Sequence, residues 1–193
     1  MFNEKAKSAD AVGAALERLL GSDEHARAGG VYRIECRDKD GNLKWTAESK
    51  NLVVNVGLQD MNAKYFTGSA YTAVWYLGLI TGPASGITIA AGNTMASHAG
   101  WSEATGYSNA TRPACTFGTP TTANPSVATN SASAATFNMN ATATIAGAFL
   151  TTDNTKGGTT GTLYSAAAFS APGDRSVVSG DTLTVIYTLS LAG

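Results

Sequence analysis

Hydrophobic and polar residues alternate with a period of two along the stretch ATFNMNATATIAGAFL, from Ala135 to Leu150. Its apolar positions include Phe137 and Ile145, and Thr or Asn occupies the positions between them. Because successive side chains of a strand point to opposite faces, the pattern predicts one β-strand with a buried apolar face. The other face is polar but uncharged, which favours contact with another protein over contact with bulk water, although the interior of a small-residue barrel would give a similar pattern.

The same alternation in other segments predicts a mainly β body. Tyr32 to Cys36 and Leu43 to Ala47 alternate with polar, mostly charged residues on either side of DKDGN, which is typical of a hairpin. TLTVIYTLSLAG at the C-terminus alternates too, and AVWYLGLI, residues 73–80, predicts a central strand buried on both faces. Together with NLVV and TLYSAAAF, these runs give roughly eight strands, as expected of an antiparallel β-sandwich or jelly roll.

The N-terminal residues have helical spacing instead. SADAVGAALERLLG, residues 8–21, combines a capping serine and a final glycine with apolar residues at Val12, Leu16, Leu19 and Leu20. This pattern predicts a short amphipathic helix, followed by a polar linker that ends in two glycines. We therefore expect an N-terminal arm over residues 1–30 and a β body over residues 31–193. The leucine face would either bind a partner or pack on its own domain.

A second short helix is expected inside the body, at GLQDMNAKYF. Its apolar residues Leu58, Met61, Tyr65 and Phe66 recur at helical spacing from Gly57 onward. Residues 81–130 are rich in Gly, Ser, Thr, Asn, Ala and Pro, with spaced apolar residues such as Met95 and Trp101. These markers predict a long, ordered excursion of loops and short strands rather than disorder.

Charge is sparse and unevenly distributed. Charged residues make up 14% of the chain, against about 25% in ordinary soluble domains. Between Thr67 and Thr152 only Glu103 and Arg112 are charged. The net charge of −1 and the lack of a Lys/Arg run argue against nucleic-acid binding, which depends largely on neutralising phosphates. There is no apolar run long enough for a membrane helix and no signal-peptide pattern, so we expect synthesis in a cytoplasm and no membrane partner.

The sequence offers no strong catalytic or metal-binding pattern, and we expect no enzyme activity, no cofactor and no metal. His98 lacks a nucleophile motif and favours a structural role beside Trp101. The carboxylates Glu103, Asp153, Asp174 and Asp181 are isolated and suit turns better than a calcium loop. The cysteines, Cys36 and Cys115, have no metal-ligand spacing; free buried thiols are the favoured interpretation, and a disulfide stays open.

Aromatic residues could still form a sugar-binding platform. The candidates are Trp75, Trp101, Tyr107 and Tyr164. Their uneven spacing in a β protein is more typical of core residues. What remains is the composition of a protein interface, with neutral Thr, Ser, Asn and Ala faces that avoid the cost of burying charge.

Several segments carry a family resemblance. WYLGLITG, TMASHAGW, YSNATRP and TIAGAFL, within a similarity that runs from about Asp40 to the C-terminus, resemble a group of small virion structural proteins of tailed bacteriophages. Some members of this group are described as capsid decoration or cement proteins. The resemblance implies a sandwich or jelly-roll body on the outer head of a virion, where it clamps neighbouring major capsid subunits and contacts copies of itself.

Two other functions fit the same surfaces. The first is a tail fibre, adaptor or receptor-binding component, although no extended repeat is visible. The second is a carbohydrate-binding jelly-roll module. If the chain is a decoration protein, the residues expected to contact its partner are Val12, Leu16, Leu19 and Leu20.

Overall fold

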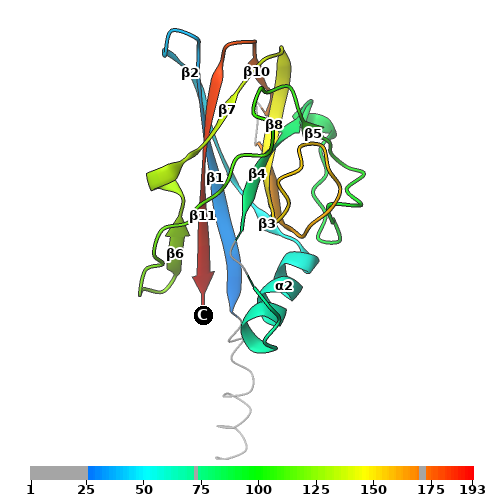
Figure 1. The fold of residues 1–193 in the computed structure, drawn as a ribbon, viewed down its shortest axis with the longest axis vertical. Coiled ribbons are helices and arrows are strands. Elements are labelled where there is room, and N and C mark those ends of the chain that lie inside the picture. Colours follow the sequence, from blue (N-terminus) through cyan, green and yellow to red (C-terminus); the bar gives the residue numbers. More distant parts are fainter. Residues whose placement is uncertain (1–25, 72–73, 170–172) are drawn as a thin grey trace, which may run out of the picture.

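The structure, a computed structural model, describes residues 26–71, 74–169 and 173–193 (Figure 1). These residues form a mainly β protein with two antiparallel sheets and one α-helix, α2 (Asn55–Phe66). Two single-turn 3₁₀ helices, η1 (Ala84–Gly86) and η2 (Ser131–Ser133), lie in the connections. The predicted mainly β, antiparallel class with one short internal helix is confirmed for the described residues.

The first sheet has five strands, which are β1 (Arg27–Arg37), β2 (Leu43–Lys50), β6 (Ser126–Thr129), β7 (Ala135–Asn138) and β11 (Thr182–Ala192). Their order is β2-β1-β11-β6, and β7 also pairs with β11, beyond the end of β6. β1 and β11 pair along their whole lengths. Asn130 joins the two short strands to β11, because its side chain accepts from the Tyr187 amide and donates to the Val185 carbonyl.

The second sheet has six strands, which are β3 (Leu52–Val53), β4 (Tyr76–Thr81), β5 (Glu103–Ala104), β8 (Ala143–Thr151), β9 (Leu163–Ala168) and β10 (Arg175–Val177). Their order is β3-β9-β8-β4-β5, and β10 pairs with the first part of β8. The chain passes between the two sheets several times. The shortest such connection is the single residue Asn51, which separates β2 in the first sheet from β3 in the second.

The main core brings together side chains from both sheets. Ile34 on β1 and Val185 on β11 belong to the same buried cluster as Leu77 and Leu79 on β4. A second cluster includes Ile80 on β4 and Phe149 on β8, together with Met95 and Trp101 from the excursion of residues 81–130. The excursion therefore buries these two strands on a second face. The prediction that residues 73–80 contain a strand buried on both faces is confirmed for Leu77–Ile80.

The prediction of one alternating strand from Ala135 to Leu150 is wrong. β7 has the expected pattern, with Ala135 and Phe137 buried and Thr136 and Asn138 exposed. The chain then leaves the first sheet and resumes in the second as β8, where every residue from Ile145 to Thr151 is buried. A period of two places side chains on faces, but it does not show where a strand ends and changes sheets.

The predicted hairpin and C-terminal strand are confirmed. Tyr32, Ile34 and Cys36 on β1 are fully buried, and Leu183 and Val185 on β11 are too. The turn between β1 and β2 has Gly41 at φ +84°, in the left-handed region. The Asp38 carboxylate accepts from the Asn42 side-chain amide, and also from the backbone N–H groups of Asn42 and Asp40; these bonds close the turn and lower the pKa of Asp38. β1 begins at Arg27, within the segment expected to be linker.

Candidate interaction surface

A groove of about 570 Å³ lies between α2 and residues of both sheets. Its walls come from α2, the chain before β4, the segment before Pro120, and the ends of β6 and β11, which contribute Met61, Trp75, Phe117, Ala128 and Leu189. Among the described residues that line it, none is charged. The groove is in the size range of pockets that hold small ligands or a few apolar side chains.

Aromatic contacts connect several of the residues that line the groove. The Trp75 and Tyr164 rings meet edge to face with centroids 5.4 Å apart, and the Tyr164 hydroxyl donates to the Met61 sulfur at 3.3 Å. The Trp75 indole N–H donates to the Tyr71 hydroxyl at 3.1 Å. Burial raises the pKa of the Tyr164 hydroxyl to about 12, which favours its neutral form further.

Helix α2, which contributes Met61 to this groove, also carries exposed aromatic side chains. Tyr65 and Phe66 are 83% and 76% exposed, and their rings pack edge to face with centroids 4.8 Å apart. The apolar periodicity predicted this helix correctly, but its apolar side chains are mostly exposed, and Leu58 is exposed as well. Tyr65 and Phe66 are adjacent in the sequence, so they do not lie on the same face of the helix. Gly57 is the one residue of α2 that is buried among those described.

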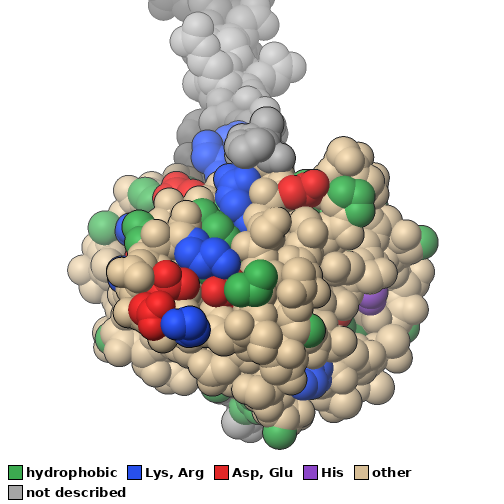
Figure 2. Space-filling model, turned by 90° about the horizontal axis from the view of Figure 1, so that it is seen from above, with side chains coloured by type: hydrophobic (Ala, Val, Ile, Leu, Met, Phe, Trp, Pro, Cys, Tyr) green, Lys and Arg blue, Asp and Glu red, His purple; other side chains and the backbone are tan. Residues whose placement is uncertain are grey.

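The surface contributed by the middle of the chain carries no exposed charge. Glu103 and Arg112, the two charged residues between Thr67 and Thr152, bind each other, and their side chains are 8% and 0% exposed. Figure 2 shows the result on one face of the molecule, where charged side chains gather in one part and neutral atoms cover most of the rest. The sequence shows that charged residues are scarce in this part of the chain, but it does not show that Glu103 and Arg112 are buried together.

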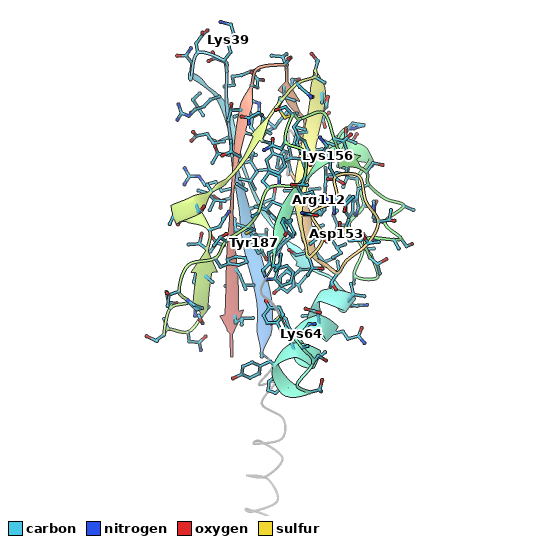
Figure 3. The ribbon with its side chains drawn as sticks, in the orientation of Figure 1. Lys39, Lys64, Arg112, Asp153, Lys156 and Tyr187 are labelled. Carbon is cyan, nitrogen blue, oxygen red and sulfur yellow. The ribbon has the colours of Figure 1, made fainter. Side chains whose placement is uncertain are left out.

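The Arg112 guanidinium joins the excursion to the loop between β8 and β9. It binds both oxygens of the Glu103 carboxylate, at 3.0 and 2.8 Å, and donates to the carbonyls of Asp153 and Gly158. Its face lies 5.2 Å from the Phe149 ring centroid. Lys156 adds a second tie, because its ammonium donates to the carbonyls of Tyr107 and Asn109; Figure 3 shows Arg112, Asp153 and Lys156 in one region of the body.

The histidine and the carboxylates singled out from the sequence take structural roles. The His98 ring stacks on Trp101 with centroids 3.9 Å apart, which confirms the expected neighbour. Asp174 accepts from the Ala84 amide at 2.6 Å, and Asp153 accepts from the Thr155 amide, which lowers the pKa of Asp153. Asp181 holds the turn before β11 and is also 2.5 Å from the Lys44 ammonium, an ion pair that its position in the sequence did not indicate.

The aromatic candidates for sugar binding belong to the core. Trp101, Tyr107 and Tyr164 are at most 6% exposed, which confirms the interpretation of these three as core residues. Trp75 and Tyr164 both line the groove, and Trp75 is only partly buried there. Within the described ranges, no three His, Cys, Asp or Glu side chains are grouped so that they could hold a metal ion. No helix of the described part is long and apolar enough to cross a membrane.

A polar cluster lies buried between the sheets. The Tyr32 hydroxyl is 2.7 Å from the Ser165 hydroxyl, which is in turn 3.4 Å from the Tyr187 hydroxyl. Asn51 donates to Tyr187 at 2.8 Å, and the rings of Tyr32 and Tyr187 are 4.5 Å apart. Burial raises the pKa of both tyrosines. Because these hydroxyls satisfy one another inside the core, the cluster links the two sheets rather than forming an accessible site.

Both cysteines are free and buried, as the favoured interpretation predicted. Burial raises the pKa of Cys36 to about 11 and that of Cys115 to about 12. Since the thiolate is the reactive form, we expect neither thiol to react with a disulfide reagent at pH 8 until the protein unfolds. Thiol titration along a urea transition checks this, and reaction of either cysteine well before the loss of β-structure would contradict it.

The predicted partner-binding residues Val12, Leu16, Leu19 and Leu20 lie outside the described residues, and so does His25. The structure therefore leaves the arm contact a prediction. It adds two features that the sequence did not indicate, the apolar groove and the exposed aromatic pair. No family model, curated protein or solved structure matches the chain.

Proposed function

We propose that this chain is a non-catalytic virion structural protein of a tailed bacteriophage, a decoration protein that binds the outer head and clamps neighbouring major capsid subunits. In this proposal the two sheets are the layers of a β-sandwich or jelly roll, and residues 1–30 are a helical arm. One observation carries the proposal: the long middle of the chain exposes no charge, and α2 exposes a pair of aromatic rings.

Such a surface suits binding to protein over a large area. Charged groups lose favourable hydration when they are buried, whereas hydroxyl and amide groups can form hydrogen bonds across an interface. Aromatic side chains are enriched at the centres of interfaces and contribute much of the binding energy there. The exposed Tyr65 and Phe66 are therefore the proposed anchor.

A decoration role also needs only modest binding by each copy. Copies that bind neighbouring sites of a lattice and one another gain avidity without any new type of contact. The buried tie between Arg112 and the loop between β8 and β9 would keep such a loop-rich surface in a fixed shape.

Electron cryomicroscopy of the intact particle that contains this chain tests the location. Density of the chain repeated across the outer head would support the proposal and identify the contacting residues. Density confined to the tail would favour the fibre or adaptor function instead. Absence of the chain from the particle would overturn any virion role.

The double variant Tyr65→Ser/Phe66→Ser tests the anchor. We expect it to weaken binding to particles stripped of this protein by at least about tenfold, because two desolvated aromatic contacts are lost. Its stability should change little, since exposed residues contribute within about 0.5 kcal/mol. Leu43→Ser, at a 54% exposed position on the distant hairpin, is the matched control. Equal particle binding by both variants and the parent would rule out this anchor.

A further inference from the structure

The described chain begins close to the apolar groove. β1 starts at Arg27, and its residue Gly30 is the register partner of Leu189, which lines the groove. Figure 1 shows the start of β1 and helix α2 at the same end of the body. The 25 residues that precede the described part are thus attached beside the groove rather than at the far end of the molecule.

The preceding residues have the pattern that such a groove accommodates. Val12, Leu16, Leu19 and Leu20 follow the spacing i, i+4, i+7 and i+8, which places them on one face of a helix. Helices that dock in grooves use anchors with this spacing. The groove offers matching chemistry, because its walls are apolar or aromatic, and among the described residues that line it none is charged.

The linker is long enough to bring this face back to the groove of the same chain. Leu20 and Ala26 are six residues apart, which spans up to about 20 Å when extended. The chain from Ala26 to Gly30, which lies beside the groove, is four residues of nearly extended strand and spans about 13 Å. A return of the helix along the body is therefore within reach.

Docking within one chain is also favoured over docking on a second copy. Four side chains on one helix cover far less than the roughly 1,200 Å² buried by the smaller stable protein interfaces. A short linker, however, gives the segment an effective concentration on the order of millimolar at its own groove. We propose that residues 8–20 form a helix that packs Val12, Leu16, Leu19 and Leu20 into the groove of the same chain. This inference does not depend on the proposed function.

Paramagnetic relaxation in NMR spectra tests the contact directly in the full chain. Asp10 would point away from the leucine face, and Asp10→Cys introduces a cysteine that can be spin-labelled beside two buried, native thiols. We expect the label to weaken the amide signals of groove residues such as Phe117 and Leu189 at least twofold. Signals at the hairpin turn, near Gly41, should be unaffected.

A mixing experiment separates the two occupants. Spin-labelled protein without ¹⁵N is mixed with ¹⁵N-labelled protein without a spin label, so that only contacts between copies weaken the signals. Docking within the chain predicts no effect in the mixture. Weakened groove signals in the mixture would show that a second copy is bound instead, and unchanged signals in both experiments would show that the groove takes no arm; either result overturns the proposal.

Matched variants show whether the leucine face makes the contact. Leu16→Ser/Leu19→Ser should abolish the signal loss at the groove, whereas Glu17→Ser/Arg18→Ser, largely away from that face, should retain it. On the body, Val74→Ser at the groove should reduce the loss at least twofold. Val178→Ser, at a similarly exposed valine that does not line the groove, is its control. If each variant lost as much groove signal as its control, specific docking of the leucine face would be contradicted.

Discussion

Replacing Arg112 with methionine is expected to lower the free energy of unfolding by about 3–5 kcal/mol, the cost of breaking a buried ion pair by removing one partner. The methionine would leave the Glu103 carboxylate in the interior without its guanidinium partner, although the Gly157 amide would still donate to it. The carbonyls of Asp153 and Gly158 would also lose their guanidinium donors. Each unpaired polar atom retains the cost of its desolvation, so the loss exceeds that of one hydrogen bond.

Urea unfolding followed by circular dichroism measures this effect. Arg33→Met, at an exposed position of β1, is the matched control and should change stability by less than about 0.5 kcal/mol. The combination Arg112→Met/Glu103→Gln should recover part of the loss, because it removes the uncompensated charge. A loss below about 1 kcal/mol for Arg112→Met would mean that the pair does not hold the excursion in place.

The strands predicted correctly are those whose information is local. β1 and β2 combine an alternating pattern with a turn that requires Gly41 in the left-handed region, and both signals lie within one stretch of chain. β4 is an apolar run, which indicates burial on both faces wherever it lies in the fold. Residues 135–150 were misjudged because the boundary between β7 and β8 depends on which strands they pair with, β11 in one case and β4 and β9 in the other.

The candidate surface was less predictable, because it depends on contacts distant in sequence. The sequence predicts an isolated carboxylate at Glu103, but in the structure Glu103 pairs with Arg112. These two residues are the only charges in a long neutral stretch, and this was the one signal in the sequence that they pair. The groove combines residues of α2, β6 and β11, which no local pattern brings together. The exposure of Tyr65 and Phe66 follows from how α2 docks, which the helical period does not determine.

The docking of α2 depends on Gly57, and this gives a prediction with an unexpected sign. Alanine favours an isolated helix over glycine by about 0.5–1 kcal/mol, so helix propensity alone predicts that Gly57→Ala stabilises the protein. A Cβ at this position would lie 2.4 Å from the Tyr164 carbonyl oxygen of β9, a backbone atom that cannot rotate away. We expect the clash to prevail and Gly57→Ala to lower the free energy of unfolding by about 1–3 kcal/mol, as overpacking does.

Asn62→Ala is the matched control for this variant, because it also raises helix propensity but lies at an exposed position of the same helix. It should stabilise the protein by a few tenths of a kcal/mol. Hydrogen exchange should show faster opening of α2 in Gly57→Ala alone, since the clash moves the helix away from β9 and Met61 away from Tyr164. If Gly57→Ala is instead as stable as Asn62→Ala, α2 is held by contacts other than this close approach, and neither the groove nor the exposed aromatic pair would depend on it.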